Sequence, residues 1–199
     1  MSPTGQPGVR LRPSPSGARP APSAQRRAPR QAGFTLFELL VVVGIISAIL
    51  AISVPMLMRA RMAANEAAAI GSLRTVSSAE AGYSGAAAPG GYAILLATLA
   101  TPCPGSSVGF ISPDLSIDPS TRNGYIITLA PGTGVPGPDD CNGNATLTGY
   151  YSTAAPISAG RTGHRAFAST HRAVLFVDPT GVPPTNAQMA PGGGGTPLQ

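Results

Sequence analysis

The chain has 199 residues, a length that allows one domain with appendages. Its 13 basic residues, all arginine, outnumber its eight acids, but six of the 13 precede Gly33 and no acid does. The seven arginines and eight acids beyond Gly33 nearly cancel. The composition therefore argues against a basic nucleic-acid-binding surface, and no specific nucleic acid is expected as a partner.

Residues 1–33 are predicted to form a basic, disordered leader. They are rich in Pro, Ser, Ala and Arg and contain few bulky apolar side chains, so they cannot bury enough surface to fold. Such a segment before an apolar stretch is typical of a processing signal rather than of a folded element. Its arginines favour a cytoplasmic N-terminus, because basic residues that flank a membrane helix are retained on the cytoplasmic side.

An apolar stretch follows the segment Gly33-Phe34-Thr35-Leu36-Phe37-Glu38 and runs for 20 residues, from Leu39 to Met58. This length suffices to span a bilayer. A carboxylate at the centre of a membrane helix costs about 2.5–3.5 kcal/mol on insertion scales, so an acid such as Glu38 usually has a partner and a function. We expect residues 34–58 to form the membrane-spanning half of a long helix. Pro55 should kink it, because proline removes one backbone hydrogen bond.

The pattern GFTLFELLVV, from Gly33 to Val42, resembles the cleavage and methylation motif of type IV prepilins. The resemblance covers residues 33 to about 83 and is weaker beyond them. It implies cleavage by a prepilin peptidase after Gly33 and N-methylation of the new terminus at Phe34. In this family the matching acid pairs with the N-terminal amine of a neighbouring subunit, so the resemblance implies that Glu38 and Phe34 direct subunit assembly.

From residue 59 onward the pattern becomes amphipathic. Apolar side chains such as Leu73 and Val76 recur at helical spacing, and charged residues occupy the remaining positions. Because alanine is abundant, helix is favoured. We expect one helix from Phe34 to about Ala81, ended by Gly82, with residues 59–83 as its amphipathic half.

Residues 84–178 are predicted to form a globular head. Tyr92–Ala100 fits either a short helix or a strand. Strand candidates bounded by turn residues are Tyr125–Leu129, Thr146–Thr153, Arg165–Ser169 and Ala173–Val177. The apolar helix stripe and the strands each need a cover, which predicts an α+β fold: a small antiparallel sheet of three or four strands packed on the long helix, in a pilin-like layout. Residues 179–199 are expected to be a disordered tail.

The two cysteines, Cys103 and Cys141, both follow the apolar stretch. Their spacing fits no zinc motif, and a domain on the outer side of the membrane lies in an oxidising compartment. A disulfide is therefore expected, with two buried free thiols as the alternative.

Other side chains give little indication of chemistry. His164 and His171 are the only histidines, and the G-x-S-x-G nucleophile motif does not occur, so we expect a protein that is not an enzyme and has no cofactor. Residues 139–144 carry Asp and Asn oxygens but lack the spacing of an EF-hand. A solvated acidic loop is favoured there, and no metal site is predicted.

Three functions agree with these features. The first is a structural subunit of a type IV pilus-like filament: an inner-membrane precursor with a cytoplasmic N-terminus that polymerises through its helix into a periplasmic or extracellular filament. By resemblance, its partners are prepilin peptidase, identical or related pilin subunits, an inner-membrane assembly platform with its ATPase, and the lipid bilayer before assembly. The second is a pseudopilin of a type II secretion system. The third, a membrane-anchored periplasmic binding module that never polymerises, explains neither Gly33 nor Glu38.

Overall fold

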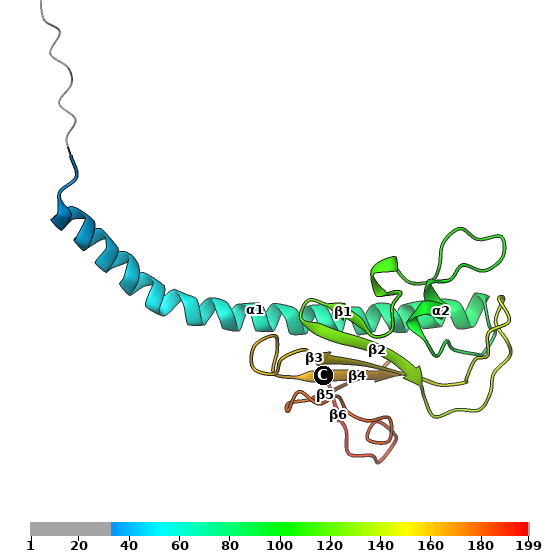
Figure 1. The fold of residues 1–199 in the computed structure, drawn as a ribbon. Helices are drawn as coiled ribbons and strands as arrows, with labels where there is room; N and C mark the ends of the chain where they lie inside the picture. The colour runs from blue at the N-terminus through cyan, green and yellow to red at the C-terminus, as the bar shows by residue number, and fades with distance from the viewer. Residues whose placement is uncertain (1–32, 199) are drawn as a thin grey trace, which may run out of the picture. The chain divides into compact units, whose positions relative to one another are not determined.

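The computed structural model describes residues 33–198, so the predicted leader before Gly33 lies outside the described residues. The chain divides into two compact units at Val43 and Gly44, and each is described by itself. The elements, in chain order, are α1 (Leu36–Ala86), α2 (Leu96–Ala100), the 3-10 turn η1 (Pro113–Leu115), β1 (Ser120–Arg122), β2 (Tyr125–Pro131), β3 (Tyr150–Pro156), β4 (Ala166–Thr170), β5 (Leu175–Asp178) and β6 (Thr196–Pro197) (Figure 1).

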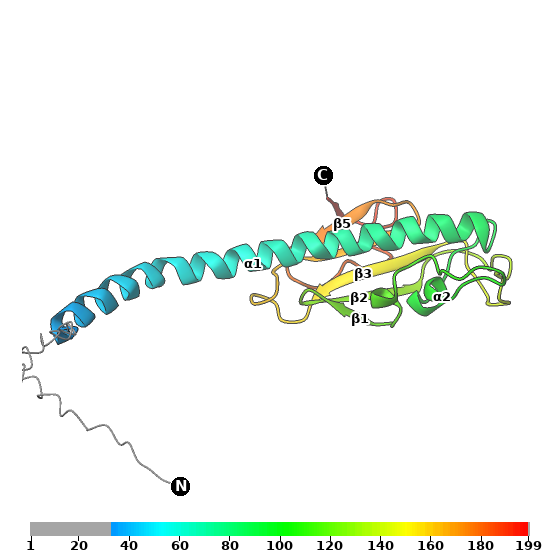
Figure 2. The same ribbon diagram turned by 90° about the horizontal axis from the view of Figure 1, so that it is seen from above.

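All six strands form one antiparallel sheet in the order β1-β2-β3-β4-β5-β6. Within the second unit, α1 lies along one face of this sheet (Figure 2). The alternating residues Tyr125, Ile127 and Leu129 of β2 are buried, as the period-2 geometry of a strand requires when one face is covered. The fold is therefore the predicted α+β, pilin-like arrangement of a long N-terminal helix on an antiparallel sheet.

One stripe of α1 forms the helix side of the core. Its buried apolar residues are spaced three or four apart, which places them on one face of a helix. They are Ala69, Leu73, Val76, Ala79 and Tyr83. This stripe packs into a single cluster with side chains of β2, β3 and β4 and of α2. The amphipathic half of the helix is thus covered by the same chain.

The end of α1 differs from the prediction. The helix continues through Gly82 to Ala86 instead of ending near Ala81. Packing overrides the low helix propensity of glycine here: a Cβ at Gly82 would lie 3.6 Å from the Phe110 ring, and Phe110 in turn stacks edge-on against the buried Tyr83. The turn after the helix spans residues 87–90 and includes Gly90, which has φ +85°.

The sheet also has more strands than predicted. The four central strands coincide with the four predicted ones, although β3 begins at Tyr150 rather than at Thr146. Residues 146–149 precede it and form isolated bridges from Leu147 to Tyr92 and Pro136. The edge strands β1 and β6 have three and two residues, too short to give a periodic pattern. The ambiguous segment Tyr92–Ala100 contains a short helix, α2.

The prediction of a disordered tail is wrong for the described residues 179–198. β6 pairs with β5, Met189 is buried, and the Tyr151 hydroxyl donates to the Pro184 carbonyl at 2.6 Å. The reason lies in β4, whose residues are buried on both faces of the sheet. One face of β4 meets α1, and the other needs a second cover, which explains why a glycine-rich segment without periodicity packs there.

Glu66 fastens α1 to the start of β4. Its Oε1 accepts the backbone N–H groups of His164 and Arg165 at 2.9 and 3.2 Å, and its Oε2 accepts Arg165 Nε at 2.8 Å and pairs with Nη2 at 2.7 Å. Burial by itself would raise the pKa of Glu66, but these donors outweigh burial and lower the pKa. The carboxylate is therefore held ionised against the sheet.

Glu80 lies deeper and is held differently. Its side chain is fully buried, its Oε2 accepts the Ala93 N–H at 3.0 Å, and its Oε1 has no hydrogen-bond partner. Burial raises the pKa of Glu80 to about 8, against the opposing effect of the Ala93 N–H. The hydroxyls of Tyr83 and Tyr150 interact electrostatically with Glu80 and are neutral at this pH, because burial raises the pKa of both tyrosines. Glu80 is therefore protonated in the folded head at neutral pH.

Replacing Glu66 with Ala should lower the free energy of unfolding of the head by about 2–3 kcal/mol, because part-buried donors lose a buried, charged acceptor. Unfolding of the full chain in detergent, followed by near-ultraviolet circular dichroism of the tyrosines, measures this loss. Asp114→Ala is the matched control, because it breaks an ion pair with Arg122 that is exposed at both ends. It should cost less than about 1 kcal/mol, and equal losses would contradict the role of Glu66.

Glu80 should make the head less stable as the pH rises. Its pKa is raised from 4.5 to about 8 on folding, so between these values the folded head holds a proton that the unfolded chain has lost. The stabilisation that comes from protonated Glu80 is complete below about pH 4.5. It decreases by on the order of 1 kcal/mol per pH unit up to about pH 8 and then levels off. Glu80→Gln stays neutral and should lack this slope, so the difference between the unfolding profiles of the two proteins should show it. Parallel profiles for the two proteins would show that Glu80 is ionised in the folded state.

Candidate processing and assembly site

The predicted cleavage position lies at the exposed start of the described chain. Gly33 and Phe34 precede α1, and Phe34 is 82% exposed. A Cβ built at Gly33 would meet no atom within 4 Å. Among the described residues 33–198, nothing therefore packs against Gly33, and Phe34 is largely exposed, as an enzyme that cuts between them requires. Cleavage and methylation at these residues stay predictions.

Glu38 closes the first turn of α1 in a capping box with Thr35. The Thr35 N–H and hydroxyl donate to Glu38 Oε2 at 2.9 and 2.8 Å, and the Glu38 N–H donates to Thr35 Oγ1 at 3.2 Å. Two backbone N–H groups at the helix start, which have no partner inside a helix, are thereby satisfied. The T-x-x-E spacing of Thr35 and Glu38 is the sequence signal of this motif, and the prediction of Glu38 as an assembly residue alone overlooked it.

Both contacts from the Thr35 side chain and backbone fall on the same carboxylate oxygen, Oε2. Among the described residues no hydrogen bond reaches Glu38 Oε1. The carboxylate can therefore cap its own helix through one oxygen and offer the other to a cation. This geometry allows the predicted pairing with an amine, which itself stays a prediction because a second subunit supplies it.

The apolar half of the helix is exposed throughout. None of its large side chains is less than 41% exposed, and most are above 50%. They are Phe34, Leu36, Phe37, Leu39, Leu40, Val41, Val42, Val43, Ile45, Ile46, Ile49, Leu50, Ile52, Val54, Met56, Leu57 and Met58. α1 is long and apolar enough, by length and composition, to cross a membrane. Pro55 lies inside α1, and the kink expected there stays a prediction.

The two cysteines form the predicted disulfide. Cys103 follows α2 and Cys141 follows the long loop after β2, and their Cα atoms lie 5.5 Å apart across 38 residues of sequence. In the chain-entropy model a loop of this length corresponds to about 4 kcal/mol of stabilisation. The disulfide ties the loops around α2 to the loop before β3.

Asp140, beside the disulfide, is a structural residue rather than an exposed ligand. Its Oδ1 accepts the N–H groups of Asn142 and Asn144, and its Oδ2 accepts the Tyr83 hydroxyl at 2.8 Å and Asn144 Nδ2 at 3.0 Å. Burial would raise the pKa of Asp140, but these donors lower it. Within residues 33–198 no group of three His, Cys, Asp or Glu side chains is arranged to hold a metal ion. The loop is solvated in part, but Asp140 anchors it to α1.

The histidines and serines considered for catalysis serve other contacts. The Ser169 hydroxyl lies 3.3 Å from the Ser77 hydroxyl of α1. His164 contributes its backbone N–H to Glu66, and the His171 ring lies 6.3 Å from the Tyr92 ring. The contacts of Ser169 and His164 hold β4 and its start against α1, and none of the three contacts joins a nucleophile to a base.

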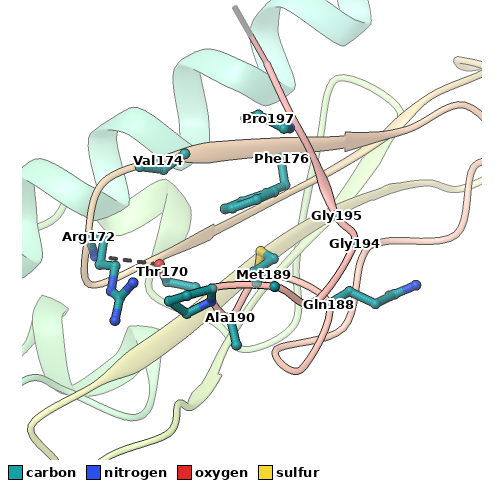
Figure 3. Close-up of a pocket in the computed structure, with 13 residues that line it drawn as sticks. Thr170, Arg172, Val174, Phe176, Gln188, Met189, Ala190, Gly194, Gly195 and Pro197 are labelled. Atoms are coloured by element: carbon teal, nitrogen blue, oxygen red, sulfur yellow. Dashed lines mark hydrogen bonds between the residues drawn. The ribbon is translucent and has the colours of Figure 1, made fainter.

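A pocket of about 390 Å³ opens between the β4–β5 hairpin and the tail (Figure 3). Phe176 lines it and alternates with Leu175 and Val177, which pack against the core, so the pocket lies on the sheet face away from α1. Its other walls are mostly apolar, with Arg172 at one side. Since the pocket brings no pair of titratable groups together, it marks the packing of the tail rather than a reaction centre.

Comparison with known proteins agrees with the motif. Residues 28–54 match the model of the prokaryotic N-terminal methylation motif, which is typical of type IV pilins and pseudopilins. No curated protein and no solved structure matches the chain. The match covers Gly33, Phe34, Glu38 and most of the exposed apolar helix, and it stops before the head. The chain therefore carries the N-terminal methylation motif of type IV pilins and pseudopilins, at the start of an α+β fold with a pilin-like layout.

Proposed function

We propose that this protein is a structural subunit of a type IV pilus-like filament, processed by prepilin peptidase and polymerised through the N-terminal half of α1. The observation that carries the proposal is the methylation motif directly before an apolar helix surface that its own chain leaves exposed. A motif of this class implies processing by a prepilin peptidase and assembly with related subunits. It also suits an inner-membrane precursor.

The exposed surface supplies the driving force for two successive environments. Each large apolar side chain contributes about 1.5–3 kcal/mol when it leaves water. Lipid covers these side chains in the precursor, and neighbouring helices cover them in a filament. Because lipid is as apolar as a helix bundle, the choice between the two rests on helix packing, on polar contacts and on an assembly ATPase.

Glu38 supplies the polar contact in this proposal. Cleavage after Gly33 creates an amine at Phe34, and Oε1 of Glu38 on a neighbouring subunit accepts it. A carboxylate inside an apolar bundle gains most from a fixed cation, since the surroundings screen the charge poorly. The pairing would thus align each new subunit relative to the one before it.

The finer choice of a pilus subunit over a pseudopilin of a type II secretion system is supported by the loop before β3. Calcium binding, known in some secretion pseudopilins, needs free oxygen ligands. Both oxygens of Asp140 already accept donors from Tyr83, Asn142 and Asn144, and a disulfide holds the same loop. A non-polymerising anchor is disfavoured, because it would need neither Gly33 nor Glu38.

Processing is the first test. Intact-mass and N-terminal analysis of protein from membranes should find a chain that begins at Phe34 and carries an N-methyl group, provided that prepilin peptidase is present. Gly33→Val should leave the leader attached, because a branched side chain blocks the approach of the peptidase to the backbone. A mature terminus beyond the apolar stretch would contradict the proposal.

The second test separates the two roles of Glu38. Glu38→Gln keeps a capping-box acceptor but removes the charge, whereas Glu38→Ala removes both. We expect both variants to be cleaved and inserted in the membrane, to lose N-methylation, and to yield at least about tenfold less filament in sheared fractions, because the apolar bundle loses its charged contact.

Thr35→Val is the matched control for Glu38, because it loses the cap hydroxyl but keeps the carboxylate. It should assemble better than Glu38→Gln. Filament yields of Glu38→Gln equal to those of the unaltered protein would reduce the role of Glu38 to helix capping.

A further inference from the structure

Two arginines from distant parts of the sequence meet where the apolar helix surface ends. A shallow pocket of about 300 Å³ is lined by Met58 and Arg61 of α1 and by Ser158, Arg161 and Thr162 of the connection between β3 and β4. We call residues 157–164 the junction loop. It lies beside α1 in both ribbon views (Figures 1 and 2). The fold thus places two guanidinium groups, 100 residues apart in sequence, on one small surface.

The junction loop is held in place by its own hydrogen bonds. The Ser158 N–H donates to the Thr162 hydroxyl and the Ser158 carbonyl accepts the Thr162 N–H, at 3.2 and 2.9 Å. Asn65 Nδ2 of α1 donates to the Thr162 carbonyl at 2.9 Å, and Glu66 accepts the His164 N–H. The backbone that carries Arg161 is therefore fastened to α1 within one or two turns of Arg61.

The charges of both arginines are uncompensated within the described chain. The ion pairs found in residues 33–198 join Arg122 to Asp114 and Arg165 to Glu66. Neither includes Arg61 or Arg161, and Glu66, the acid that follows Arg61 on α1, is already occupied by the junction loop and Arg165. Both guanidinium groups are therefore available to an anion from outside the chain.

The apolar side chains of this surface indicate where that anion lies. Met58, the last residue of the apolar stretch, is 54% exposed, and Ile157 of the junction loop is 51% exposed. When residues 39–58 span a bilayer, Met58 sits at its edge and Arg61 one turn beyond, at the depth of the lipid phosphates. Arginine suits this depth, since its stem packs on apolar groups while its planar fork binds phosphate oxygens in pairs.

We propose that Arg61 and Arg161 form a binding site for the phosphate groups of anionic phospholipids, which docks the junction loop of the head on the membrane surface before assembly. The inference rests on the proposed function, because it requires residues 39–58 to span the bilayer. The contact holds the head in one orientation over the membrane, and extraction of the subunit breaks it. Assembly therefore begins from an oriented subunit rather than from a freely tumbling head.

The test uses the full chain at one copy per lipid nanodisc, with amide hydrogen exchange of peptides that cover the junction loop. Exchange should slow at least about fivefold when phosphatidylcholine is replaced by an equal mixture with phosphatidylglycerol, since each arginine near an anionic surface contributes about this factor. The protection should vanish in 0.5 M NaCl, which screens exposed charges, and in the double variant Arg61→Gln/Arg161→Gln.

The double variant Arg74→Gln/Arg172→Gln is the matched control. It removes the same charge from the same helix and from another loop of the head, and neither arginine takes part in the ion pairs of the described chain. It should keep the protection. Protection that does not depend on lipid charge, or that needs two copies in one disc, overturns the lipid site, and the second result assigns the arginines to a contact between subunits.

The two proposals fail in different ways. A chain that alkaline carbonate strips from membranes does not span the bilayer, which overturns both the proposed function and the lipid site. A chain that resists carbonate but leaves the junction loop unprotected in anionic nanodiscs overturns the lipid site alone.

Discussion

α1 carries apolar side chains along its whole length, and the chain's own head covers only the stripe that begins at Glu66. Up to Met58 the large apolar side chains are exposed, and water is an unfavourable solvent for them by about 1.5–3 kcal/mol each. The rest of the molecule follows from this division. The head supplies an antiparallel sheet as a cover for one stripe, and the remaining helix surface depends on lipid or on other copies.

Polar groups fasten the covered half of α1 to the head at three levels. Glu66 binds the start of β4, Glu80 binds the Ala93 N–H, and Tyr83 binds Asp140 beside the disulfide. Each joins α1 to a segment that follows it in the chain by 13 to 99 residues. Because a buried polar group is costly unless it finds its partner, these contacts fix the register of the helix on the sheet, which alanine-rich apolar packing alone would specify weakly.

Glu38 illustrates how one carboxylate can serve two states of the proposed pathway. Its Oε2 satisfies Thr35 at the helix start, which stabilises the first turn before any partner is present. Under the proposed function, the second oxygen then meets an amine that exists only after cleavage. At the other end of the apolar stretch, Arg61 and Arg161 form no ion pair with an acid of the described chain, which leaves them available to the proposed lipid phosphates.

The sequence by itself determined the features that arise from local pattern. The motif from Gly33 to Val42, the apolar length up to Met58 and the helix beyond it depend on spacing within a few turns, and the α+β class follows from the periodicity of the four central strands. Only the tertiary structure decided the extension of α1 past Gly82, the edge strands β1 and β6, and the ordered tail. These features depend on packing between segments that are distant in sequence. Phe110 packs beside Gly82, and the tail packs on the outer face of β4. The placement of Arg61 and Arg161 beside one pocket belongs to this second group, because residues 100 apart in sequence have no period that would reveal their proximity.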